Sequence, residues 1–224
     1  MGRKQFVAAT GLCLILFVVS HLAGNLLLFA GPEVFNDYAH KLASLRPAFL
    51  VVEAGLLLIF VSHLAVTAML VVANVKARGQ KRYEVQQSQG DRSLATRLMP
   101  WTGTVILAFV IWHLIDFTFS DHAGPRGLMP NGEQWGLYGV VFTSFINPLH
   151  SLLYMVAMVA VGMHLSHGLQ SFVQTFGFSA LTVSPKLKRA CQGFGLLVGL
   201  AFSCIPVYVM IINYMKFSNL TPGP

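Results

Sequence analysis

The chain has few charged residues, and this scarcity excludes a water-soluble domain. Only 10% of its 224 residues are Asp, Glu, Lys or Arg, whereas 55% are hydrophobic and the mean hydropathy is +0.65. A soluble domain has about 25% charged residues, because its surface must stay in water. The sequence therefore predicts a membrane protein.

Cysteine is scarce as well, and the arrangement of the three present excludes several classes of site. Cys13, Cys191 and Cys204 form neither a CxxC nor a CxxCH motif, so the sequence predicts no disulfide framework, zinc knuckle or covalently attached haem. We interpret them as small apolar packing residues. A glycine-rich dinucleotide-binding fingerprint is absent too.

The hydrophobic residues gather in five runs, each long enough to cross a bilayer. A hydrocarbon core of about 30 Å takes about 20 helical residues. The first run is too long for a signal peptide and lacks a small-residue cleavage site, so we expect it to be retained. The sequence predicts one all-α domain over residues 1–224, a polytopic helix bundle with five transmembrane helices. Their approximate ranges are 6–30, 47–75, 100–120, 148–174 and 190–216.

Prolines mark several of these predicted spans. Pro47, Pro100 and Pro148 stand near the starts of the second, third and fourth spans, where a missing backbone N–H costs little. Pro206 falls inside the fifth span and predicts a kink there, because it removes one helical hydrogen bond.

Basic residues outnumber acidic ones, and their placement predicts an orientation rather than nucleic-acid binding. The formal net charge is +7, but Lys and Arg lie in short loops between apolar runs, as the positive-inside rule describes. With the N-terminus inside, inner segments hold eleven of the 15 basic residues and outer segments hold four. We expect a multi-pass protein of the bacterial inner (cytoplasmic) membrane, with a cytoplasmic N-terminus and an outer C-terminus. The basic inner loop 76–99 is a candidate docking surface, although orientation alone also explains its charge.

Histidine is the ionisable residue that the apolar runs do contain. Of eight histidines, five lie deep inside predicted spans: His21, His63, His113, His164 and His167. An ionisable group at that depth is costly and marks a candidate functional site. A single buried imidazole can simply bond to a carbonyl of a neighbouring helix. Four helices that each supply a histidine meet a different requirement. Two haems in a helix bundle need four axial ligands.

Depth along each helix predicts how these histidines pair. At 1.5 Å per residue, His21 and His113 lie about 15 Å and 12 Å from the outer end, whereas His63 and His164 both lie about 24 Å from it. The sequence therefore predicts an outer haem held by His21 and His113 and an inner haem held by His63 and His164. Their irons would differ in depth by about 10 Å.

Three residues near these ligands are further candidates for cofactor contact. Gly24 and Gly168 follow His21 and His164 closely, and a glycine lets a flat macrocycle approach a helix. Close packing between helices explains both glycines equally well. His167 lies about 4.5 Å deeper than His63, where it could meet a haem propionate or a partner subunit.

Four motifs carry a resemblance to a known family: "SHLAGNLLLF", "VSHLAVTAML", "WHLIDF" and "HLSHGLQSFVQTFG". Over nearly its whole length the chain is similar to the dihaem cytochrome b subunits of succinate:quinone and quinol:fumarate oxidoreductases, in their five-helix, single-anchor form. In that family the last motif begins with a haem histidine, followed by a glycine four residues later and then a Trp-Gly or Phe-Gly pair. Here these positions are His164, Gly168 and Phe176-Gly177. The family also pairs ligands between the first and third spans and between the second and fourth.

The resemblance implies a membrane anchor that exchanges electrons between a quinone, either menaquinone or ubiquinone, and an iron–sulfur subunit. It implies two haem b groups in this chain, and a flavoprotein subunit that interconverts succinate and fumarate. The resemblance leaves open whether the whole complex forms a dimer. Some family members carry a glutamate, linked to transmembrane proton movement, two residues before the fourth-span histidine. This chain has Gly162 there, so that proton path is not carried over.

Quinone chemistry also needs proton exchange, and two acids in the outer half are relevant to it. Glu53 lies about 9 Å deep in the second span, near the level of the outer haem, and is a candidate quinone or proton site. A structural acid near a helix start explains it equally well. Asp116 follows His113 by three residues, and we expect it to bond to a neighbouring helix or to a propionate.

Two other classes of function remain open at the sequence level. One is a cytochrome b anchor of another respiratory enzyme, such as a hydrogenase or formate dehydrogenase, although such anchors typically offer ligands from different helices. The other is a transporter or structural membrane protein without haem, whose histidines carry protons or bond across helices.

Overall fold

The structure is a computed structural model that describes residues 2–78, 94–177 and 184–217, and these residues form an all-α bundle. Its elements are α1 (Arg3–Leu26), a 3₁₀ turn (Leu27–Ala30), α2 (Pro32–Ser44), α3 (Ala48–Arg78), α4 (Leu94–His113), a π-helical turn (Leu114–Thr118), a 3₁₀ turn (Pro125–Gly127), α5 (Gly136–Ile146), α6 (Pro148–Thr175) and α7 (Pro185–Phe217). Within the described ranges there is no β-strand, only an isolated antiparallel bridge between Leu128 and Gln134.

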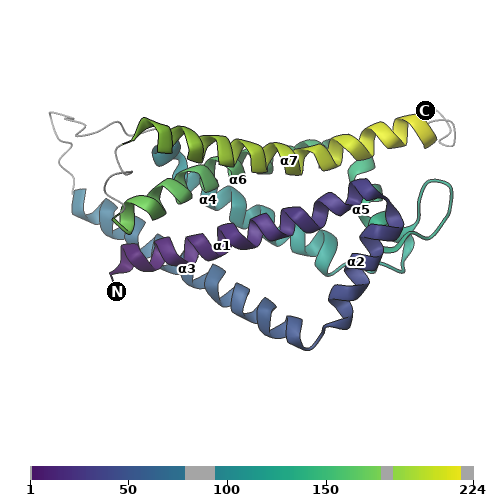
Figure 1. Cartoon of the computed structure of the whole chain (residues 1–224), viewed down its shortest axis with the longest axis horizontal. Helices are drawn as coiled ribbons and strands as arrows, with labels where there is room; N and C mark the ends of the chain where they lie inside the picture. The colour runs from purple at the N-terminus through teal and green to yellow at the C-terminus, as the bar shows by residue number, and fades with distance from the viewer. Residues whose placement is uncertain (1, 79–93, 178–183, 218–224) are drawn as a thin grey trace.

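Five helices in the described part of the chain are long and apolar enough to cross a membrane, as predicted. They cover Arg3–Ala30, Ala48–Ala77, Leu98–Thr118, Pro148–Thr175 and Pro185–Lys216. In Figure 1, α7 ends at the end of the bundle opposite the start of α1, as an odd number of crossings requires. These spans are helical because lipid offers backbone N–H and C=O groups no hydrogen-bond partners, and a helix satisfies those groups within the segment.

Helix boundaries follow backbone chemistry more closely than hydrophobicity. α6 begins at Pro148, where the Asn147 side chain accepts hydrogen bonds from Leu149 N (2.9 Å) and His150 N (3.2 Å). Its last turn ends at Thr175, and Gly177 then adopts a left-handed φ of +76°, which stops the helix. The Phe176-Gly177 pair is therefore a helix terminator.

The third span begins at Leu98, so Pro100 stands near its start as predicted, although the helix α4 itself already begins at Leu94. The fifth span begins at Pro185, before the expected residue 190. Polar residues outside the hydrocarbon continue a helix as readily as apolar ones, so helices exceed their apolar runs. Pro206 does lie inside α7.

α6 is the central helix of the bundle. It packs most extensively against α7 and also against α4 and α1, whereas α3 packs chiefly against α1. Figure 1 shows α1 and α3 converging toward the end that holds the N-terminus and separating toward the other end, where α2 joins them. This arrangement brings all four helices that carry buried histidines around one region.

A cap of α2, α5 and their flanking turns covers the end of the bundle opposite the N-terminus. Its core contains Leu28, Phe35 and Phe142, each less than 5% exposed. Asn36 of α2 joins the two helices, because its amide donates to Trp135 O (3.0 Å) and accepts from Tyr138 N (3.1 Å). The cap holds α5 beside the π-helical turn that follows His113.

Candidate cofactor-binding site

The first histidine pair joins α1 and the end of α4. The ring centroids of His21 and His113 lie 5.8 Å apart, with ring planes at 89°. Phe17 stacks on His21 at 5.5 Å, and Phe109 lies 5.6 Å from His113. The structure thus brings together the two histidines that their depth predicts to form the outer pair. Aromatic side chains pack against both rings.

The second pair joins α3 and α6. His63 and His164 lie within electrostatic range of each other. The Nδ1 atom of His63 lies 3.0 Å from Thr10 Oγ1 on α1, and that of His164 lies 3.1 Å from Thr102 Oγ1 on α4. Each ring is therefore held at Nδ1 by a helix other than its own.

The other three candidates near the ligands differ in their surroundings. A Cβ added at Gly24 would meet Tyr38 Oη at 2.6 Å, so this glycine makes room for the Tyr38 ring of α2. A Cβ at Gly168 would make only an ordinary contact with Ile15, at 3.9 Å. His167 is half-buried and lies within electrostatic range of His164. Contact of these residues with a cofactor stays a prediction.

Glu53 lies near the start of α3 on the surface of the described chain. Its side chain is 53% exposed, and its Oε2 lies 3.8 Å from Nη2 of Arg46, which is 60% exposed. An exposed ion pair of this length contributes little to stability. Its role as a quinone or proton site stays a prediction.

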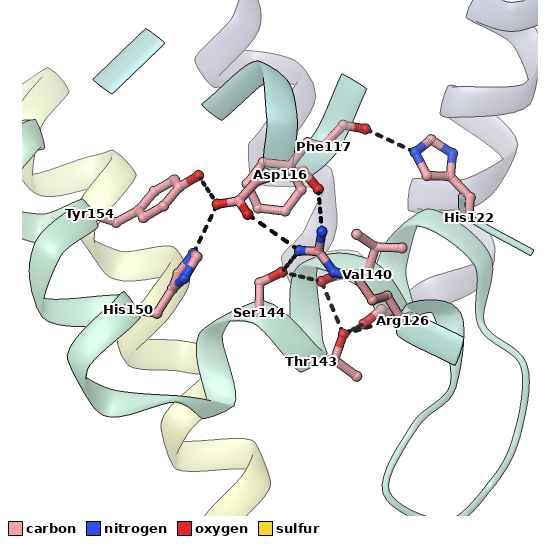
Figure 2. A network of polar contacts seen from close by, with 10 residues as sticks. Asp116, Phe117, His122, Arg126, Val140, Thr143, Ser144, His150 and Tyr154 are labelled. Carbon is pink, nitrogen blue, oxygen red and sulfur yellow. Dashed lines mark hydrogen bonds and ion pairs between the residues drawn. The ribbon is translucent and has the colours of Figure 1, made fainter. Parts of the chain in front are cut away.

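A buried polar network lies directly beyond His113, and Figure 2 shows it centred on Asp116. Asp116 is 8% exposed, and its Oδ2 accepts a 2.7 Å hydrogen bond from the Tyr154 hydroxyl of α6. The Nε2 atom of His150 lies 3.1 Å from the same oxygen, outside hydrogen-bond geometry. Asp116 therefore bonds to a neighbouring helix, which was one of the two partners expected for it.

Arg126 supplies the positive charge of this network. Its Nη2 lies 3.6 Å from Asp116 Oδ1 and donates to Ser144 Oγ at 2.7 Å, while Nη1 donates to the Asp116 carbonyl at 3.0 Å. Asp116 lies in the π-helical turn, where Phe119 N bonds to Leu114 O at 2.9 Å. Such turns recur at functional sites. This network was not predicted from the sequence, because a π-helical turn and the path of an outer loop produce no periodic pattern of hydrophobic residues.

The histidines occur in pairs and not in larger clusters. Among the residues that the structure describes, no three His, Cys, Asp or Glu side chains group closely enough to hold a metal ion. Structural zinc needs four protein ligands, whereas haem iron needs only two axial ones. The donor set therefore fits haem better than a bare metal ion. The basic loop 76–99 lies mostly outside the described residues, which resume at 94.

Comparison with known proteins agrees with the resemblance drawn from the motifs. The chain is 27% identical over 191 residues to the succinate dehydrogenase cytochrome b558 subunit of Bacillus subtilis (strain 168). The aligned region covers 85% of this chain and 85% of that protein. No protein-family model and no solved structure matches the chain. The chain is thus a multi-pass helical protein similar to a succinate dehydrogenase cytochrome b subunit.

Proposed function

We propose that this chain is the membrane anchor and dihaem cytochrome b subunit of a succinate:quinone or quinol:fumarate oxidoreductase. Two observations support the proposal. The relative from Bacillus subtilis matches most of both chains. Two pairs of half-buried histidines also lie close enough to interact, the first with ring centroids 5.8 Å apart, and each pair is drawn from two different spanning helices.

The observation that carries the proposal is the outer pair, in which rings of His21 and His113 lie 5.8 Å apart. Two imidazoles from different helices that lie this close in an apolar bundle would together hold a haem iron. A bound haem b supplies one-electron redox chemistry at each pair.

The chain's own residues would bind and insulate these groups. His21 and His113 would hold the outer haem iron, and His63 and His164 the inner one. Aromatic and aliphatic side chains around the rings exclude water. An electron path would then run between the membrane face at α2 and α5 and the face at the N-terminus, where a flavoprotein and an iron–sulfur subunit would dock. Glu53 is kept as a candidate proton-exchanging group for menaquinone or ubiquinone.

A reduced-minus-oxidised spectrum of the purified complex tests the proposal, with haem counted per chain. We expect a b-type band and two haems. His21→Ala and His113→Ala should each remove the outer haem, and His63→Ala and His164→Ala the inner one, because each change takes away one of the two protein ligands proposed for that iron. His40→Ala, at an exposed position, is the matched control and should retain both.

Three outcomes would contradict specific parts of this proposal. Absence of any b-type band would contradict the haem-binding function and favour a transporter or structural membrane protein. Copurification with a hydrogenase or formate dehydrogenase, without a flavoprotein, would assign the anchor to another enzyme. Loss of a haem in His167→Ala but not in His164→Ala would place the inner ligand one turn farther along α6.

A further inference from the structure

Two threonines in the apolar spans are buried beside the inner histidine pair. Thr10 of α1 is 9% exposed and Thr102 of α4 is 8% exposed. A hydroxyl in such a place needs hydrogen-bond partners, because its desolvation is costly. Thr10 Oγ1 lies 3.0 Å from His63 Nδ1, and Thr102 Oγ1 lies 3.1 Å from His164 Nδ1.

The single proton of each hydroxyl is directed toward the threonine's own helix. Thr10 Oγ1 donates to the carbonyl of Phe6 at 2.9 Å, with Val7 O at 3.1 Å, and Thr102 Oγ1 donates to Met99 O at 3.1 Å. This back-bonding is the usual arrangement of threonine within a helix. With its proton on that carbonyl, each hydroxyl oxygen can only accept from its histidine, an arrangement that requires the imidazole proton at Nδ1. The His63 ring also lies in hydrogen-bond range of the Val7 backbone.

A neutral imidazole protonated at Nδ1 has its lone pair at Nε2. His63 and His164 are thus both held as the tautomer whose Nε2 can bind a metal. Metal-binding histidines generally donate their other ring N–H to an acceptor, which fixes the tautomer and makes the ligand more basic.

A glycine follows each threonine, but only Gly11 makes room for the ring beside it, since a Cβ at Gly103 would make an ordinary contact. A Cβ added at Gly11 would lie 3.3 Å from Cε1 of His63, and one added at Gly103 would lie 3.5 Å from Cε1 of His164. The same Thr-Gly dipeptide thus occurs on α1 and α4, each time against one member of the inner pair.

The outer pair is held differently. His113 Nδ1 is buried and makes no hydrogen bond to any described residue. Aromatic rings surround it instead, including Phe109 at 5.6 Å and Phe117 at 5.2 Å. His113 therefore differs from His63 and His164 in its hydrogen bonding. Hydrogen bonding to the ligands is one of the factors that set the reduction potential of a haem.

We propose that Thr10 and Thr102 are positioning residues that select the tautomer of His63 and His164 and increase their electron donation to the inner haem iron. The proposal rests on the proposed function, because it concerns a group bound by these two histidines. It assigns Thr10 and Thr102 a role that acts through the ligands and not by contact with iron.

Thr10→Val and Thr102→Val test the proposal, since valine keeps the shape of threonine and removes the hydroxyl. In the purified complex we expect the midpoint potential of the inner haem to shift to more positive values, because a less basic ligand stabilises the oxidised iron less well. The electron paramagnetic resonance signal of that ferric haem should shift as well. The double variant should bind the inner haem about 10- to 100-fold more weakly.

Several controls separate this effect from a structural one. Thr10→Ser and Thr102→Ser keep the hydroxyl and should restore the potential. Thr104→Val removes a hydroxyl that bonds only to Pro100 O at 2.9 Å, two residues from Thr102, and should leave both haems unchanged. The outer haem serves as an internal control for folding in every variant.

Unchanged potential and resonance signal in both valine variants, with two haems bound, would overturn the inference and leave the proposed function standing. Absence of haem from the unmodified chain would instead overturn the proposed function. Should the valine variants lose both haems, ¹⁵N-histidine resonances of the unmodified, reduced protein decide the matter. Slowly exchanging Nδ1 protons on His63 and His164 support the inference, and their absence contradicts it.

Discussion

At the scale of single residues, Asp116 shows how a charge is tolerated within an apolar span. Its carboxylate receives the Tyr154 hydroxyl, lies 3.6 Å from Arg126 and lies 3.1 Å from His150. Arg126 in turn donates to Ser144 of α5. One acid thereby joins the end of α4 to α6 directly, and to the outer loop and α5 through Arg126, just beyond the outer histidine pair.

Asp116→Asn should destabilise the protein by about 1–3 kcal/mol, because it leaves Arg126 without a counter-charge while preserving the size of the side chain. Thermal unfolding in detergent measures the effect. Asp121→Asn is the matched control, since Asp121 is exposed and its side chain accepts only from Ala123 N, at 2.9 Å. Equal melting temperatures for both variants would show that the network contributes no stability.

At the scale of elements, the contact between α6 and α7 depends on glycines that face each other. A Cβ added at Gly162 would meet Gly195 O at 2.6 Å, and one at Gly199 would meet Met158 O at 3.0 Å. Small residues let membrane helices approach closely in this way. At Gly162 any side chain would collide with the backbone of α7, so the close contact requires glycine at this position.

Gly195→Leu should separate α6 from α7 and lower the melting temperature strongly, because its Cβ would collide with Gly162 O and would lie 2.7 Å from Ser166 Cβ. Overpacking of this kind costs about 1–3 kcal/mol or more. Gly193→Leu on the same helix is the control, since nothing lies within 4 Å of its added Cβ. The packing argument fails if both variants melt at the same temperature and yield equal amounts of folded protein.

At the scale of the whole molecule, the five spans place the start of α1 and the end of α7 at opposite ends of the bundle. We expect the basic residues to decide which end faces the cytoplasm, because eleven of 15 fall in the sequence segments predicted to be inside. The cap of α2 and α5 would face outward, together with the Asp116 network.

Reporter fusions check this orientation. Alkaline phosphatase joined after Phe217 should be active, because that enzyme matures only outside the cytoplasm, whereas a fluorescent protein joined there should stay dark. The same fluorescent protein joined before Met1 is the control and should emit. Inactive phosphatase with a fluorescent C-terminal fusion would reverse the predicted topology.

The sequence alone was sufficient for the number of spans, and it predicted that His21 and His113, like His63 and His164, lie at matching depths. Both follow from local physics: lipid forces the backbone into helices, and the fixed helical rise converts residue number into depth. The third span begins within two residues of Pro100, as predicted, whereas the fifth begins at Pro185 and not near residue 190, since helices continue past their apolar runs.

Only the tertiary structure decided which side chains meet across helices. It placed Thr10 on His63, Thr102 on His164, Tyr38 over Gly24, and Tyr154 with Arg126 around Asp116. The physical reason is rotation. Depth depends on a residue's position along one helix, whereas contact depends on how each helix turns about its axis, and packing against all of its neighbours sets that turn.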